Sequence, residues 1–308
     1  MSDPFEVRYE VPVAGGALRV ARAGPPAEEA DAVVLVVHGV TSSLEIWRAV
    51  ARELSSRSRV CLLAPDLRGR GHSTDLPAPY GIAAHLADLL AVLDDAGAER
   101  AVAVGHSLGG FVVASLAATH PERVSGVVLL DGGLVVPAPP VGDLAEVLEG
   151  AVDMALFRSQ MTFDSVDEYV ESWQMHPAFA QAWDDDVEAY GRYEVAGEPG
   201  DMRFVVCEKA VRADLTELVY EEATRRAVER VRAPIRLLYA PRGMLNEAYP
   251  VIPRPILDAF LASQPDAIVE QVPGVNHYTI ALGAGPGPRA VATAIEAAVR
   301  DQATSTSR

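Results

Sequence analysis

The sequence predicts an α/β protein built on a mostly parallel sheet with helices on both faces. Short apolar runs that do not alternate with polar residues recur before residue 131, and amphipathic segments separate them. Such runs are typical of strands that are buried on both faces, as in parallel sheets. One of them leads into G-H-S-L-G at 105–109, the pattern of a sharp strand-to-helix turn. Strand-like runs return from residue 235, after a long segment of different character.

The chain begins with a predicted hairpin over residues 5–23 that turns at Gly15 and Gly16. Alternating strands and helices follow, with strands expected at 33–37, 60–64, 101–104 and 124–130 and helices at 44–54, 82–96 and 108–119. Two more strands are expected at 235–240 and 268–272, and a closing helix at 290–301. The order strand, helix, strand indicates one sheet covered on both faces.

The segment between the two groups of strands has its own composition, with acidic helical stretches and much of the aromatic and methionine content. We therefore divide the chain into a core domain formed by 1–132 and 233–302, a helical lid or cap insertion at 133–232, and a disordered tail at 303–308. The three aspartates at 184–186 are interpreted as a solvated helix face, because consecutive side chains on a helix point in different directions.

Composition excludes several classes of function. With 308 residues, 49% of them hydrophobic, the chain can bury a large core. A net charge of −17 disfavours nucleic acid and anionic membranes as partners. The sequence has no cysteine or histidine cluster typical of a metal site, no leader-like N-terminus and no membrane-length apolar run. We expect a cytoplasmic protein with a small-molecule substrate and no cofactor; a homodimer stays open.

Ser107 is the expected nucleophile. It stands at the centre of G-x-S-x-G, between a predicted strand and a predicted helix. Gly105 and Gly109 remove side chains that would clash in the turn, and the serine is lifted out at the positive end of the helix. An ordinary serine in a tight turn would leave both glycines unexplained.

Three motifs together resemble the α/β-hydrolase fold family. Besides the serine turn, H-G-V-T-S-S at 38–43 resembles the family's oxyanion loop, and D-L-R-G-R-G-H-S at 66–73 resembles its D-x-R-G-x-G-x-S turn. The resemblance covers roughly 30–131 and 235–300. It implies the family's fold, and an oxyanion hole formed by the backbone N–H groups of Val40 and Leu108.

The same likeness implies structural roles for His38, Asp66 and Arg68. The stretch 38–47 is also similar to the loop of haloalkane dehalogenases, whose nucleophile is an aspartate. Since Ser107 occupies that position here, aspartate-dependent chemistry, including epoxide hydrolysis, is disfavoured.

His277 is the expected base among seven histidines. It follows the last predicted strand and precedes the final helix, where the family keeps its triad histidine. A histidine there can take the proton of the serine hydroxyl. His106 is the variable position of the turn, and the remaining candidates are expected to face solvent: His72, His85, His120 and His176.

The triad acid has two candidates. Most of the family carries it after the strand that follows the insertion, where this chain has Gly243. Asp131 ends the strand 124–130, a position used by haloalkane dehalogenases, and Glu247 lies in the later loop. We favour Asp131 because a strand end fixes a carboxylate better than a loop does, and Glu247 stays the alternative.

These residues predict a serine hydrolase that cleaves a largely apolar carboxylic ester or lactone through an acyl-enzyme. Cleavage of a C–C bond beside a ketone, or perhydrolysis, would use the same residues. A ligand-binding protein on a hydrolase scaffold is the alternative from another class. The insertion should roof an apolar cleft, and its expected wall residues are Trp173, Met175, Phe179 and Trp183.

Overall fold

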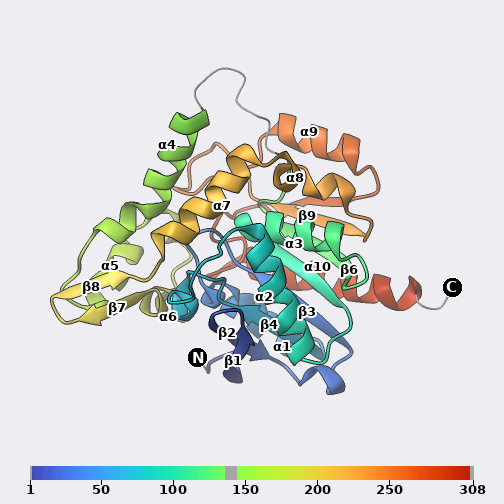
Figure 1. Cartoon of the computed structure of the whole chain (residues 1–308), viewed down its shortest axis with the longest axis horizontal. Coiled ribbons are helices and arrows are strands. Elements are labelled where there is room, and N and C mark those ends of the chain that lie inside the picture. The colour runs from blue at the N-terminus through green and yellow to red at the C-terminus, as the bar shows by residue number, and fades with distance from the viewer. Residues whose placement is uncertain (1, 136–143, 306–308) are drawn as a thin grey trace.

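The computed structural model describes residues 2–135 and 144–305 and is built around one eight-stranded sheet (Figure 1). From one edge to the other, the strands are β1 (Val7–Val13), β2 (Gly16–Ala23), β4 (Val60–Pro65), β3 (Ala32–Val37), β5 (Ala101–His106), β6 (Val124–Leu130), β9 (Ile235–Tyr239) and β10 (Ile268–Gln271). The predicted hairpin is β1–β2, which runs antiparallel, and β2 is antiparallel to β4. All other pairs are parallel, as expected.

Helices cover both faces of the sheet. One face packs against α1 (Arg48–Ser55) and α10 (Pro286–Ser305), and the other against α2 (Ile82–Asp95), α3 (Leu108–Thr119) and α9 (Arg254–Ser263). Side chains of a strand alternate between the two layers: Val34 and Val36 of β3 lie in the core with α1, while Leu35 lies in the core with α3. Both layers are apolar, which explains why β3 and its neighbours have no polar alternation.

Several boundaries differ from the prediction. The expected helix 44–54 is divided into a 3-10 turn, η2 (Leu44–Trp47), and α1. Helix α10 is longer than predicted and continues to Ser305, so the expected tail overlaps its last turn, and 306–308 lie outside the described residues. Two other short 3-10 turns occur in the first half of the chain, η1 (Ala27–Glu29) and η3 (Gly71–Ser73).

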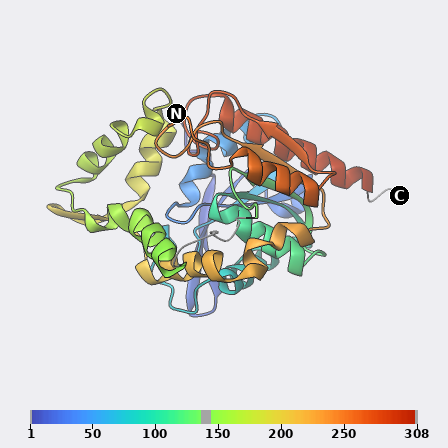
Figure 2. The same cartoon turned by 90° about the horizontal axis from the view of Figure 1, so that it is seen from above.

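The first part of the insertion between β6 and β9 extends to one side of the sheet, and its last helices return over the core toward α9 (Figures 1 and 2). Its described elements are α4 (Leu144–Leu156), η4 (Phe157–Gln160), α5 (Val166–Gln174), η5 (Pro177–Phe179), α6 (Asp185–Tyr193), β7 (Val195–Glu198), β8 (Asp201–Phe204), α7 (Glu208–Tyr220), α8 (Glu222–Arg225) and η6 (Ala227–Arg230). The hairpin β7–β8 was not predicted, although E-P-G-D at 198–201 is a turn signal between its strands. Residues 136–143 of the insertion lie outside the described residues.

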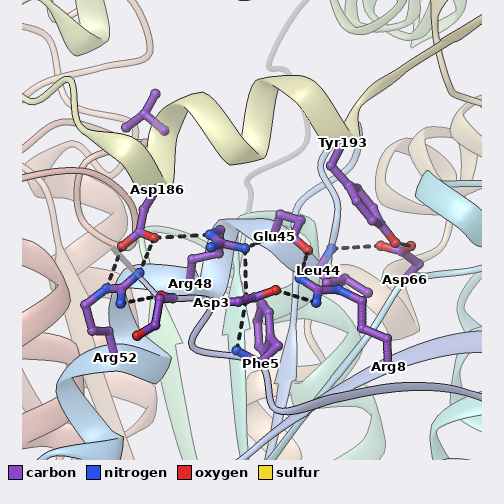
Figure 3. A network of polar contacts seen from close by, with 12 residues as sticks. Asp3, Phe5, Arg8, Leu44, Glu45, Arg48, Arg52, Asp66, Asp186 and Tyr193 are labelled. Atoms are coloured by element: carbon purple, nitrogen blue, oxygen red, sulfur yellow. Dashed lines mark hydrogen bonds and ion pairs between the residues drawn. The ribbon is translucent and has the colours of Figure 1, made fainter.

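Charged side chains tie α6 of the insertion to the core (Figure 3). Asp186 is buried and accepts hydrogen bonds from Arg48 at 3.1 Å and from Arg52 at 2.7 Å. The tyrosine hydroxyl of Tyr193 donates to the buried carboxylate of Asp66 at 2.6 Å. The prediction of a solvated face is therefore wrong for Asp186, because two arginines of the core approach this side of the helix.

A second tie joins α7 to the core. Asp214 is fully buried and accepts from the guanidinium of Arg70 and from Nε2 of His85 at 3.0 Å. The expectation that His85 faces solvent is wrong, because helix α7 covers the face of α2 that carries it. None of the helices in the described part of the chain has the length and apolar character needed to cross a bilayer.

Candidate active site

Ser107 occupies the turn between β5 and α3 with φ 55° and ψ −119°, an unusual conformation for a non-glycine residue. Its N–H donates to the carbonyl of Leu130 at 3.0 Å, which fixes the turn against the neighbouring strand. A Cβ atom at Gly105 would overlap the carbonyl oxygen of Gly109, and one at Gly109 would overlap that of Val37. The turn can form only because both positions lack a side chain.

Asp131, at the end of β6, contacts His277. Its Oδ2 lies 2.7 Å from Nδ1 of the imidazole, and its Oδ1 accepts the N–H of Ala240 at 3.1 Å. The aspartate is fully buried and the histidine is 4% exposed. Because a carboxylate can only accept, Nδ1 carries the proton and Nε2 is left as the acceptor, the form that a general base requires.

Glu247 lies elsewhere. Its side chain is exposed and its Oε2 accepts the N–H of Leu245 at 2.7 Å, within its own loop. The structure thus brings the strand-end candidate, Asp131, to His277 and leaves the loop candidate in a local turn.

Two residues that were not singled out for a role fix the backbone around His277. The Oδ1 atom of Asn276 accepts the N–H groups of Tyr278 and Thr279 at 3.0 Å, and its amide donates to the carbonyl of Ala178 at 2.8 Å. Nε2 of His106 lies 2.8 Å from the carbonyl oxygen of His277 and donates to it, and burial lowers the pKa of His106. Asn276 precedes His277 in the sequence and His106 precedes Ser107. This adjacency is the only feature of the sequence that indicates a role for them.

His38 holds the loop that contains Val40. Its Nε2 accepts the N–H of Leu67 at 2.9 Å, so Nδ1 carries the proton and donates to the carbonyl of Gly39 at 2.8 Å. Burial lowers the pKa of His38 to about 3, which keeps the ring neutral. In a trans peptide the N–H of Val40 points opposite to the Gly39 carbonyl, so fixing that carbonyl fixes the N–H.

The predicted oxyanion donors have two further supports. Nε–H of Arg70 donates to the carbonyl of Val40 at 2.9 Å, and Asp214 balances the charge of this buried guanidinium. Leu108 is the first residue of α3, so its N–H has no partner within the helix and lies at the positive end of the helix dipole.

Ser107 lines two cavities. The larger, of about 170 Å³, is apolar, with walls formed by Val40, Leu108, Phe111, Leu134, Leu215, Leu218, Val251, Ile252 and Ile256. The smaller, of about 40 Å³, carries polar groups from the loop after β3 and from the insertion: Thr41, Ser42, Arg158, Tyr190 and Tyr278. His277 also lines the smaller cavity. A substrate whose scissile bond lies between Ser107 and His277 would therefore place one half in the apolar cavity and the other half in the polar one.

Comparison with known families identifies the fold. A family model described as alpha/beta hydrolase fold matches residues 32–185, half of the chain. The chain belongs to the α/β-hydrolase fold family. Its predicted fold class, a mostly parallel sheet flanked by helices with a helical insertion, is confirmed.

Individual relatives of this α/β-hydrolase differ in their named activities. Lipase LipV of Mycobacterium tuberculosis is 38% identical over 44% of this chain and 49% of its own length. Epoxide hydrolase A of the same organism is 41% identical over 41% of this chain and 37% of its own. The chain thus spans half or less of the length of these relatives. The structure of E-2-(acetamidomethylene)succinate hydrolase superposes with a TM-score of 0.75, covering 96% of this chain and 99% of that one at 21% identity, which shows the shared fold.

The four expected wall residues of this α/β-hydrolase lie away from both cavities beside Ser107. Trp173 and Phe179 are buried against each other, with ring centroids 5.4 Å apart, and Trp183 packs against the same core. Met175 is 79% exposed. Residues from α7 and the loop before α9 line the apolar cavity instead, because the aromatic residues of α5 and η5 pack among themselves.

No group of three or more His, Cys, Asp or Glu side chains arranged to hold a metal ion occurs within 2–135 and 144–305. The side chains that meet beside Ser107 are suited to nucleophilic attack, proton transfer and stabilisation of an oxyanion.

Proposed function

We propose that the chain is a serine hydrolase that cleaves a carboxylic ester or lactone through an acyl-enzyme on Ser107. The observation that carries the proposal is the contact between Asp131 and His277, beside a cavity that both His277 and Ser107 line. A serine, a histidine and a buried carboxylate used in this order form the constellation that acyl-transfer enzymes share on unrelated folds.

The reaction follows from the roles of these groups. Nε2 of His277 takes the proton as the Ser107 hydroxyl attacks the carbonyl carbon, and Asp131 stabilises the imidazolium that forms. The N–H groups of Val40 and Leu108 donate to the oxyanion, and one such donor contributes about 3 kcal/mol to transition-state stabilisation. The intermediate expels the alcohol, which receives the proton from His277. Water, activated by the same histidine, then releases the acid from the serine.

A fluorophosphonate probe tests the proposal without knowledge of the natural substrate. We expect one adduct per chain, located at Ser107 by peptide mass spectrometry and lost in Ser107→Ala and His277→Ala. Ser115→Ala, in the buried part of α3, is the matched control and should keep the adduct. Folded protein that admits the probe yet forms no adduct would sink the proposal and favour a ligand-binding scaffold.

The type of bond is tested with a substrate panel. We expect the highest kcat/KM for hydrolysis of carboxylic esters and lactones. Three other reactions should be slower: C–C cleavage of a β-diketone, transfer of an acyl group to peroxide instead of water, and hydrolysis of an epoxide. An epoxide as the best substrate would contradict the serine mechanism, because Ser107 replaces the aspartate on which that chemistry depends in the similar dehalogenase-type enzymes.

A further inference from the structure

The smaller cavity has one arginine in its wall, and the ester mechanism gives that arginine no task. Arg158, in η4 of the insertion, lines this cavity together with Ser107 and His277. Its side chain is 23% exposed. Among the described residues that line the cavity, it is the only arginine or lysine.

The guanidinium of Arg158 is held rigidly. Its Cζ atom lies 4.5 Å from the ring centroid of Trp173 and 4.4 Å from that of Phe204. Nη1 donates to the hydroxyl of Tyr169 and to Oε2 of Glu194, both at 3.1 Å. A side chain fixed in this way loses little conformational entropy when it binds a ligand.

Part of the same guanidinium has no partner in the protein. An arginine has five N–H donors, and those of Nε and Nη2 meet no acceptor within the described ranges 2–135 and 144–305. These two nitrogens form an edge that matches the two oxygens of a carboxylate. Glu194 offsets the charge of Arg158 from the Nη1 side and leaves this edge free.

The rest of the cavity also suits a small anionic group. The hydroxyls of Ser42 and Tyr190 lie 3.2 Å apart in its wall, and both can donate hydrogen bonds. About 40 Å³ accommodates a group the size of a carboxylate. The larger cavity, at about 170 Å³, accommodates a benzene-sized apolar group, since about 150 Å³ suffices for benzene.

Resting on the proposed function, we infer that Arg158 binds a free carboxylate on one half of the substrate while the other half occupies the apolar cavity. The substrate class is then an ester that carries a carboxylate a few bonds from the scissile carbonyl. Such a compound is either a half-ester of a short dicarboxylic acid or an ester of a short hydroxy acid.

Two matched pairs of esters test this inference, each replacing one methyl group with a carboxylate. Mono-p-nitrophenyl succinate is compared with p-nitrophenyl butyrate, and O-benzoylglycolate with ethyl benzoate. In at least one pair we expect kcat/KM to favour the carboxylate by about tenfold or more, mostly through KM. Arg158→Met should lose the preference, and Arg158→Lys should keep part of it. Arg203→Met, at an exposed position of the insertion, should leave it unchanged.

Binding to the Ser107→Ala protein separates this inference from the proposed function. By calorimetry, the preferred carboxylate ester should bind Ser107→Ala and lose affinity when Arg158→Lys or Arg158→Met is added. An enzyme that hydrolyses the neutral member of both pairs faster, or that keeps its carboxylate preference without Arg158, overturns the inference and leaves the serine mechanism intact. If Ser107 neither reacts with the probe nor hydrolyses any ester, the proposed function fails, and the calorimetric comparison still decides the role of Arg158.

Discussion

Asp131 makes two contacts that a surface carboxylate could not make. One oxygen faces Nδ1 of His277 and the other accepts the N–H of Ala240, so the strand that follows the insertion fixes the carboxylate from the opposite side. Its backbone N–H also donates to Leu238 of that strand at 2.9 Å. The orientation of the imidazole therefore depends on the pairing of β6 with β9.

Asp131→Asn should lower kcat by about 10³- to 10⁴-fold with a small change in KM, because an amide no longer selects the tautomer with the proton on Nδ1. Glu247→Gln is the matched control and should retain activity, since this carboxylate only accepts the N–H of Leu245. Steady-state kinetics on the best ester of the panel measure both. The opposite ranking would transfer the role of acid to Glu247.

His38→Ala should lower kcat about tenfold or more and change KM little, because the Gly39–Val40 peptide loses the hydrogen bond that orients its N–H. His120→Ala, at a partly exposed position far from this loop in the sequence, is the control. Thermal unfolding of both variants separates a loss of stability from a loss of rate. A variant whose KM rises while kcat stays constant would show that His38 supports binding rather than the oxyanion.

Much of the site could be predicted at this scale, because Ser107, His277 and Asp131 each end or follow an element with a clear apolar pattern. Arg158 could not be predicted, since its position beside Ser107 depends on how the insertion packs. The supposed wall residues were misplaced for the same reason: an apolar pattern predicts that Trp173 is buried but does not identify its neighbours.

Helix α6 joins the insertion to the core through charges. Asp186 binds both Arg48 and Arg52, and Arg48 also contacts Glu45 of η2 at 2.7 Å (Figure 3). Since η2 follows directly after the loop that contains Val40, the same network connects α6 with the region of the oxyanion loop. Tyr190 of α6 and Ile46 of η2 both line the smaller cavity, so this network joins two of its walls.

Asp186→Asn should lower the free energy of unfolding by about 3 kcal/mol, because it leaves two arginine charges with less compensation in a buried site. Glu171→Gln, an exposed position on α5, should change it by less than about 0.5 kcal/mol. Urea denaturation of the whole chain measures both. Equal stability of the two variants would mean that the arginines find other partners.

At the scale of elements, apolar periodicity was a reliable guide to β3–β6 and to the helices between them, because burial on both faces requires it. It failed for β7 and β8, whose residues are mostly exposed, so that only the turn at 198–201 marked the hairpin. The ion pairs of α6 and α7 join residues more than 100 positions apart, and no local pattern indicates which charges will meet.

The stability of the whole molecule should depend on pH through Asp66. Burial raises the pKa of this carboxyl to about 7, against 3.8 for the ordinary group, although hydrogen bonds from Tyr193, Leu44 and His72 oppose the shift. Between these values the folded protein binds more protons here than the unfolded chain does. This contribution to the free energy of unfolding is therefore fully present below pH 3.8 and is lost as pH rises toward 7.

Tyr193→Phe should raise the pKa of Asp66 further, because it removes a hydrogen bond that favours the charged form. The decline in stability should then extend to higher pH than in the unmodified protein. Urea titrations between pH 4 and 9 measure the difference, with Tyr249→Phe, at an exposed position, as control. Curves that stay parallel at every pH would contradict this role of Asp66.

The proposed position of the acid, at Asp131 directly after β6, has a consequence for the loop between β9 and α9. Where that loop carries the triad acid, any change in its length endangers the reaction. Here it contributes Met244 to one cavity and Val251 and Ile252 to the other, without supplying the carboxylate. Within this loop, Asn246 accepts a hydrogen bond at 3.4 Å from Asn276, which fixes the backbone around His277. With Asp131 as the proposed acid, we expect the rest of the loop to tolerate substitutions that alter which molecules enter, which makes it a rational target for directed evolution.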